Sequence, residues 1–185
     1  MANYFQSSKN SELSALQLAL NSMSLEIKKE AAKQVIAMMT IGKDVSSLFP
    51  HMVKCMETNS IELKKLVYLY IINYAKSKAD LAIMAVNSFQ KDAREKGSPL
   101  LRALSLRTMG CIRIEKITQE FLESLKAGLQ DYDPYVKKTA ALAVAKLYSI
   151  SPKMVLDQDL VKLLQGLLQD GNCLLYTSDA ADERS

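Results

Sequence analysis

The sequence predicts an all-α protein, a right-handed α-solenoid built from stacked helical hairpins. Four similar stretches recur along the 185 residues at spacings of 36, 38 and 35. Counted from the aliphatic residue of each stretch, residues that are apolar in all but one case (Ser105) follow at steps of four, four and three, which trace one face of an α-helix. A second amphipathic segment separates successive copies. A period of this length with two helical segments per copy is typical of stacked hairpins.

Each recurring stretch has a capping residue, an aliphatic residue three positions later and then a base. The four are Ser24-Leu-Glu-Ile27-Lys28, Ser60-Ile-Glu-Leu63-Lys64, Ser98-Pro-Leu-Leu101-Arg102 and Asp133-Pro-Tyr-Val136-Lys137. Serine or aspartate here accepts a hydrogen bond from the first free amides of a helix. Pro99 and Pro134 occupy the first helical position, where no amide donor is needed. Each stretch therefore predicts the start of an inner helix in a HEAT/armadillo-like repeat.

Between these starts lie the segments that we expect to form outer helices. They are residues 44–57, 79–95, 116–130 and 157–169. The run 66–72 consists of apolar and aromatic residues with high strand propensity. It falls inside the second predicted inner helix, however, and an inner helix packs on its partner and on both neighbouring repeats. We therefore expect a buried helix there.

The chain divides into three parts by pattern. Residues 1–10 are polar and are expected to form a flexible N-terminal segment. Residues 11–172 carry the repeats, about four and a half hairpins. The helical pattern stops at Cys173, and the string CLLYTSDAAD that follows resembles the in-frame translation of a transposase sequencing adapter. We expect residues 173–185 to be a non-native tail.

Several function classes are disfavoured by composition. The longest apolar run is shorter than the roughly 20 residues that cross a bilayer. Cys55, Cys111 and Cys173 are widely spaced and form no metal-like pair, as in a protein of the reducing cytosol. The only histidine, His51, has no cysteine or carboxylate pair nearby in the sequence. We predict neither enzymatic activity nor a cofactor or metal.

One base per repeat forms a ladder, which consists of Lys28, Lys64, Arg102 and Lys137. Two interpretations are open. Each base can bond to carbonyls or acids of the adjacent turn and so have a structural role, or the four can line a basic groove for phosphate. The net charge of +4 is spread along the chain and does not decide between them.

Several strings are more specific than the repeat. They are GKDVSSLFP (42–50), ELKKLVYLY (62–70), NYAKS (73–77), AIMAVNSF (82–89), LRALSLRTMGCIRIEKIT (101–118) and DPYVKKTAALAVAKL (133–147). Together they closely resemble the N-terminal trunk of beta-adaptins, the beta large subunits of heterotetrameric clathrin adaptor complexes. The resemblance covers residues 11–172.

This resemblance implies a scaffold subunit in vesicle-mediated intracellular protein transport. The implied partners are the medium, small and second large adaptor subunits, an anionic membrane surface that the complex contacts, and an Arf-type GTPase. Clathrin would be contacted only by a hinge and appendage that are absent from this chain. The implied location is cytoplasmic and peripheral, on coated vesicles of the trans-Golgi, endosome or plasma membrane.

The resemblance also implies roles for two residue pairs. Tyr4 and Phe5 resemble an aromatic pair that covers the pocket for acidic dileucine cargo signals; the alternative is a disordered tail with two incidental aromatics. Ile83 and Val86 resemble positions that meet the switch regions of an Arf GTPase. One-turn spacing would let both project as a small apolar patch, and the alternative is packing between outer helices.

A third carry-over concerns Lys28, Lys29 and Lys33. In the family, the first inner helix often begins with a basic cluster that meets phosphoinositide headgroups. Three lysines remain here, while Ser24 and Gln34 are among the residues at commonly basic places. Three lysines can assist membrane binding by an assembled complex.

Two other function classes remain as alternatives. One is a helical-repeat scaffold of a phosphatase or nuclear-transport complex. The other is a nucleic-acid-binding repeat that uses the basic ladder, whose affinity would fall steeply with salt. The resemblance to beta-adaptins implies no nucleic-acid partner.

Overall fold

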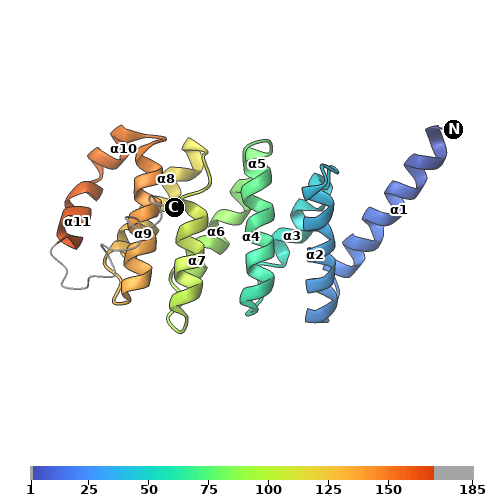
Figure 1. The fold of residues 1–185 in the computed structure, drawn as a ribbon, viewed down its shortest axis with the longest axis horizontal. Helices are drawn as coiled ribbons and strands as arrows, with labels where there is room; N and C mark the ends of the chain where they lie inside the picture. The colour runs from blue at the N-terminus through green and yellow to red at the C-terminus, as the bar shows by residue number, and fades with distance from the viewer. Residues whose placement is uncertain (1, 169–185) are drawn as a thin grey trace, which may run out of the picture. The chain divides into compact units, whose positions relative to one another are not determined.

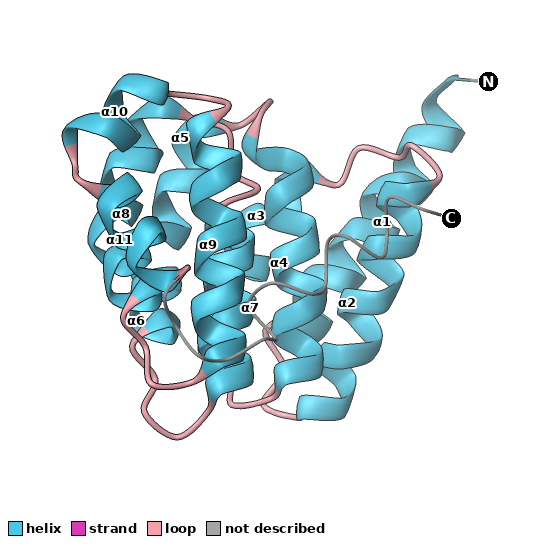
Figure 2. Cartoon of the chain, turned by 60° about the vertical axis from the view of Figure 1, so that its left-hand side comes forward, coloured by secondary structure: helices cyan, strands magenta, loops and turns pink. Residues whose placement is uncertain are grey.

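The computed structural model describes residues 2–168, with side chains from residue 11 onward. This part of the chain consists of helices joined by short loops and contains no strand, as predicted (Figures 1 and 2). The described residues divide into two compact units, one up to Ala85 and one from Val86. The expected non-native tail, residues 173–185, lies outside the described residues.

The first unit begins with a long helix, α1. Its elements are α1 (Ala2–Leu20), α2 (Leu25–Thr40), the 3₁₀ turn η1 (Ser46–Leu48), α3 (Phe49–Lys54), α4 (Ile61–Ala75), α5 (Ala79–Ala82) and the 3₁₀ turn η2 (Ile83–Ala85). Helix α2 packs between α1 and α4, and α3 packs on α4. Residues 2–10, expected as a separate segment, belong to α1.

The second unit repeats the hairpin plan. Its elements are α6 (Val86–Ala93), α7 (Pro99–Met109), α8 (Glu115–Leu129), α9 (Pro134–Tyr148), α10 (Pro152–Asp157) and α11 (Leu160–Leu167). The inner helices α7 and α9 lie side by side (Figure 1), and α8 packs on both. Helix α6 contacts α7 and α8, so the outer helices α6 and α8 both pack on the inner helix α7.

The predicted starts of the inner helices are confirmed. Ser60 accepts a hydrogen bond from the amide of Leu63, and Ser98 accepts one from Leu101. Asp133 accepts two, from Tyr135 and Val136. Ser24 occupies the capping position of α2, but its side chain makes no capping bond there. Three of the four starts thus use side-chain capping.

The first two outer helices are shorter than predicted and are interrupted. Pro50 lacks an amide donor and is compatible only with a first turn, so segment 44–57 begins as η1 and becomes α3 at Phe49. Segment 79–95 is divided into α5, η2 and α6. Ala82 and Ala85 are both buried, and a 3₁₀ turn of three residues brings them to one side.

The fourth outer segment also differs from the expectation. Residues 152–157 form α10, and the helix expected from Asp157 starts only at Leu160. Asp159 separates the two helices with a positive φ of 56°, a left-handed conformation that aspartate adopts more readily than most residues. By contrast, α8 lies within one residue of the expected 116–130.

The apolar run 66–72 is helical, as expected, and its residues are buried or half-buried except for Leu69, which is 48% exposed. Tyr68, Tyr70 and Ile71 of α4 are fully enclosed, and the Tyr70 ring lies 5.7 Å from that of Phe49. The Tyr70 hydroxyl donates a hydrogen bond of 2.7 Å to the carbonyl of Val45. Tertiary burial therefore overrides the strand propensity of this run.

Tyr70 makes the stability of the first unit sensitive to high pH. Burial raises the pKa of its phenol, and Tyr74 and Asp44 add to the increase. Above about pH 10 the unfolded chain ionises this phenol while the folded chain keeps it protonated. The free energy of unfolding should therefore fall as pH rises, approaching about 1.4 kcal/mol per pH unit.

Replacing Tyr70 by phenylalanine tests this effect. At pH 7 the variant should lose about 1 kcal/mol with the hydrogen bond to Val45. Above pH 10 the difference in free energy of unfolding between wild type and variant should disappear, because the variant has no phenol at position 70 to ionise. Urea unfolding followed by circular dichroism at pH 7 and pH 10–11 measures both. Tyr148→Phe, at an exposed site, is the control; a difference independent of pH would contradict the prediction.

Candidate functional site

Two of the three lysines singled out on α2, Lys29 and Lys33, lie close to acids. Lys29 Nζ is 3.0 Å from Glu62 Oε2 on α4 and 3.5 Å from Glu26 Oε1. Lys33 Nζ is 2.7 Å from Glu30 Oε1. These pairs form because residues three apart share a helix face, and because α2 and α4 are neighbours.

The acids hold these lysines firmly in the charged form. The hydrogen bond with Glu62 raises the pKa of Lys29, and the bond with Glu30 raises that of Lys33. Reciprocally, Lys29 lowers the pKa of Glu62. An anionic headgroup would have to compete with these carboxylates, although exposed ion pairs are weak. Lys28 is half-buried at the start of the same helix.

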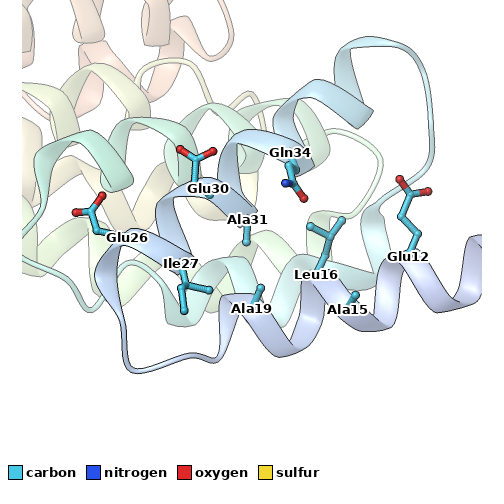
Figure 3. Close-up of a pocket in the computed structure, with 9 residues that line it drawn as sticks. All are labelled: Glu12, Ala15, Leu16, Ala19, Glu26, Ile27, Glu30, Ala31 and Gln34. Carbon is cyan, nitrogen blue, oxygen red and sulfur yellow. The ribbon is translucent and has the colours of Figure 1, made fainter.

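A groove of about 500 Å³ lies between α1 and α2 (Figure 3). Its floor combines small and aliphatic side chains from both helices, and glutamates lie at its edges. The lining residues are Glu12, Ala15, Leu16, Ala19, Glu26, Ile27, Glu30, Ala31 and Gln34. The sequence pattern did not predict this groove, because its α1 residues precede Ser24, the first predicted helix start, and the repeat indicates no helix before that point.

The two residues expected to contact a GTPase differ in their exposure to solvent. Ile83, in η2, is 51% exposed, whereas Val86, at the start of α6, is only 7% exposed. Met84 is as exposed as Ile83. The break at η2 changes the helical register, so Ile83 and Met84, rather than Ile83 and Val86, present apolar side chains to solvent. Met84 is a candidate contact that the sequence pattern did not single out.

Tyr4 and Phe5 lie within helix α1. Their side chains are outside the described residues, so their predicted place over a cargo pocket stays a prediction.

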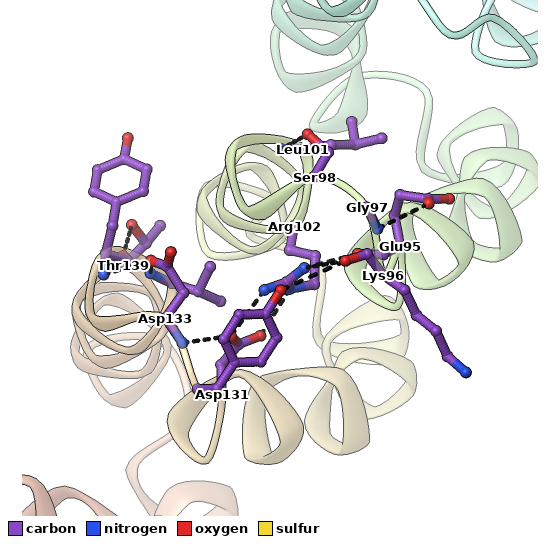
Figure 4. A network of polar contacts seen from close by, with 12 residues as sticks. Glu95, Lys96, Gly97, Ser98, Leu101, Arg102, Asp131, Asp133 and Thr139 are labelled. Carbon is purple, nitrogen blue, oxygen red and sulfur yellow. Dashed lines mark hydrogen bonds and ion pairs between the residues drawn. The ribbon is translucent and has the colours of Figure 1, made fainter.

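The third base of the ladder, Arg102, lies at the centre of a polar network (Figure 4). Its Nε and Nη2 atoms donate to the two carboxylate oxygens of Asp131, at 2.8 and 2.9 Å. Nη1 donates to the carbonyls of Glu95 and Lys96, at 2.8 and 3.4 Å. The ring of Tyr132 lies 4.8 Å from the guanidinium carbon.

This network ties three segments of the second unit together. The hydrogen bond to Asp131 raises the pKa of Arg102 further. Because Arg102 is only 4% exposed, the bonds of its guanidinium go to protein groups and leave little room for a phosphate. Of the other ladder bases, Lys64 is buried, and Lys28 and Lys137 are half-buried.

The described residues contain no cluster of three His, Cys, Asp or Glu that could hold a metal ion. His51 contacts the side chain of Asn21, with 3.0 Å between Nδ1 of His51 and Nδ2 of Asn21. Burial lowers the pKa of His51. Among residues 2–168, no helix is both long and apolar enough to span a bilayer.

Hairpin repeats with buried inner helices place this chain in the class of α-solenoid proteins. Within that class, the sequence pattern of the adaptin N-terminal region matches residues 8–179, so the chain belongs to that family.

Beta subunits of AP-1 complexes are similar to this chain over nearly its whole length. The AP-1 complex subunit beta-1 of Homo sapiens is 53% identical over 180 residues, which are 97% of this chain and 19% of the relative. The AP-1 complex subunit beta of Dictyostelium discoideum is 52% identical over the same length. The Saccharomyces cerevisiae AP-1 complex subunit beta-1 is 42% identical over 170 residues. This chain spans about a fifth of the length of these relatives.

Known structures agree on the fold. A homology model of the full-length AP-3 complex in an intermediate open conformation contains a chain 28% identical to this one, with a TM-score of 0.64. The match covers 79% of this chain and 24% of that one. A designed armadillo repeat protein, 21% identical, gives a TM-score of 0.65 over 88% of this chain and 77% of its own. The second likeness concerns the fold alone.

Proposed function

We propose that this chain is part of the trunk of a beta-type subunit in a clathrin-associated adaptor complex, and that it works in vesicle-mediated protein transport. The observation that carries this proposal is the 53% identity to AP-1 beta subunits over 97% of the chain. Stacked hairpins suit the role, because they present side chains from many helices on rigid supports. In this role the chain is a peripheral, cytoplasmic coat component.

The proposed partners are the medium, small and second large subunits of the same complex. The chain should be co-expressed with these three subunits and the assembly purified through a tag on the medium subunit. A soluble complex that contains this chain in equal amount supports the proposal. If the chain is folded by circular dichroism, and the partners are folded, yet they elute separately, the proposal fails.

We further propose that Lys28, Lys29 and Lys33 assist the assembled complex at an anionic membrane. Changing all three to glutamine should weaken binding to phosphoinositide vesicles by about tenfold or more. Each lysine adds up to about 1 kcal/mol of attraction to an anionic surface, and the carboxylates beside Lys29 and Lys33 reduce this sum. Vesicle co-sedimentation at physiological salt measures the change. The matched control changes Lys91, Lys96 and Lys116, which are exposed elsewhere. Equal loss in both variants would show that net charge, rather than this cluster, attracts the membrane.

An Arf-type GTPase is proposed to contact Ile83, with Met84 as a neighbouring anchor. Ile83→Asp should lower the affinity for the GTP-loaded GTPase by about tenfold or more, because a charge would replace an exposed apolar contact. Calorimetric titration of the complex measures it. Leu156→Asp, at a similarly exposed leucine, is the control. Val86 contributes packing in this arrangement; unchanged affinity in Ile83→Asp would remove this contact from the proposal.

A further inference from the structure

The inner helices of the second unit carry an uneven distribution of charge. Helices α7 and α9 together contain five bases and no acid. In the outer helix α8, by contrast, Glu115, Glu120 and Glu123 accompany two lysines. The bases of α7 and α9 are therefore not balanced within their own layer.

Two stripes of side chains share one exposed face. Lys146 of α9 reaches the end of α7, where its Nζ lies 3.5 Å from Cys111 Sγ. On each helix a series of positions, three or four residues apart, runs from this contact toward the N-terminus. Every position in the two series is exposed or half-buried. The eight residues define the α7–α9 face: Leu100, Leu104, Arg107 and Cys111 on one stripe, and Tyr135, Lys138, Leu142 and Lys146 on the other.

The acids that adjoin this face are already engaged. Asp131 is bonded by Arg102, and Asp133 caps the amides at the start of α9. Within the described part of the chain, the side chains of Arg107 and Lys138 have no acidic partner. The face thus presents three bases among leucine and tyrosine side chains, and the Lys146 amine donates to the thiol of Cys111.

We propose that the α7–α9 face binds an acidic segment of a partner protein, one in which carboxylates alternate with apolar side chains. Arg107, Lys138 and Lys146 would pair with the carboxylates. Leu100, at 60% exposed, and Tyr135, at 52%, would receive the apolar side chains. The stripe from 100 to 111 is about 16 Å long, enough for about five residues of an extended chain. The proposal goes beyond membership of an adaptor complex and does not depend on it.

Charge and composition favour this occupant over other anions. Membrane recognition through charge uses bases that are clustered close together, whereas the three bases of this face are spread over two helices. Nucleic-acid binding relies mainly on contacts with phosphates. Exposed leucines and a tyrosine between the bases match instead the apolar anchors and charged surroundings of a protein interface.

The test uses the chain of 185 residues and a fluorescein-labelled octapeptide with six glutamates and two leucines. Fluorescence anisotropy at low and physiological salt gives the affinity. The double variant Arg107→Glu/Lys138→Glu should bind at least tenfold more weakly. The matched control Lys116→Glu/Lys153→Glu makes the same change of charge on α8 and α10 and should stay within twofold. A peptide with glycine in place of leucine should bind several-fold more weakly than the original.

Stability is checked by circular dichroism, and Arg107→Gln/Lys138→Gln replaces the charge reversal if that variant is unfolded. Absence of peptide binding at low salt overturns the proposal, and so does an equal loss in the control. Phosphatidylserine vesicles and a single-stranded oligonucleotide are tested in parallel. If either binds through this face more tightly than the peptide, a protein segment is not its ligand.

Discussion

Replacing Gly110 by alanine should lower the free energy of unfolding of the second unit by about 3 kcal/mol or more. Gly110 ends α7 where that helix touches α9. A β-carbon added there would lie 2.7 Å from the Cα of Ala143 and 2.8 Å from its Cβ. Since the obstacle is backbone, the two helices themselves would have to move apart. Gly110 has an ordinary helical φ of −65°, so the requirement is for space and not for backbone freedom.

Two other glycines provide graded controls. At Gly128 the added carbon would meet Leu106 Cδ1 at 2.6 Å, the end of a flexible side chain, so the cost should be smaller. At Gly166 nothing lies within 4 Å. Gly166→Ala should therefore stabilise α11 by up to about 1 kcal/mol through helix propensity. Urea unfolding of the three variants should order them Gly110→Ala, Gly128→Ala, Gly166→Ala by decreasing loss, and a different order would contradict the close contact of α7 with α9.

Removal of Arg102 is the second large effect that we expect. Arg102→Ala leaves the Asp131 carboxylate without its bidentate partner and the Glu95 carbonyl without a donor. Breaking a buried pair by removing one member typically costs about 3 kcal/mol or more, because the other charge stays behind. Thermal and urea unfolding, followed by circular dichroism, measure the loss.

The control is Arg107→Ala, which removes the same side chain from an exposed place on the same helix and should change stability by about 0.5 kcal/mol or less. A double-mutant cycle with Asp131→Asn isolates the pair. Losses that add without coupling would show that Arg102 acts through packing alone. Strong coupling would support a structural role for this base of the ladder, as against a phosphate-binding groove.

The basic ladder also shows how much of a site the sequence can predict. The repeat placed a base at the start of each inner helix. It did not show that Arg102 would find Asp131, 29 residues away, or that Lys64 would be buried. The candidate GTPase contact was affected in the same way. The spacing of Ile83 and Val86 predicts a single patch only if segment 79–95 is one continuous helix, and the structure interrupts that helix at η2.

The sequence by itself determined the helical class, the repeat period and the starts of the inner helices. These depend on local physics: Ser60, Ser98 and Asp133 cap the amides that follow them, and periodic apolar residues mark one helix face. Tertiary structure alone decided the break at η2, the burial of Val86 and the meeting of Gly110 with Ala143. The repeat register already predicted a helix over residues 66–72, but tertiary structure decided how deeply each of its residues is buried. Tyr70 and Ile71 are enclosed while Leu69 is 48% exposed, because burial depends on residues that are distant along the chain.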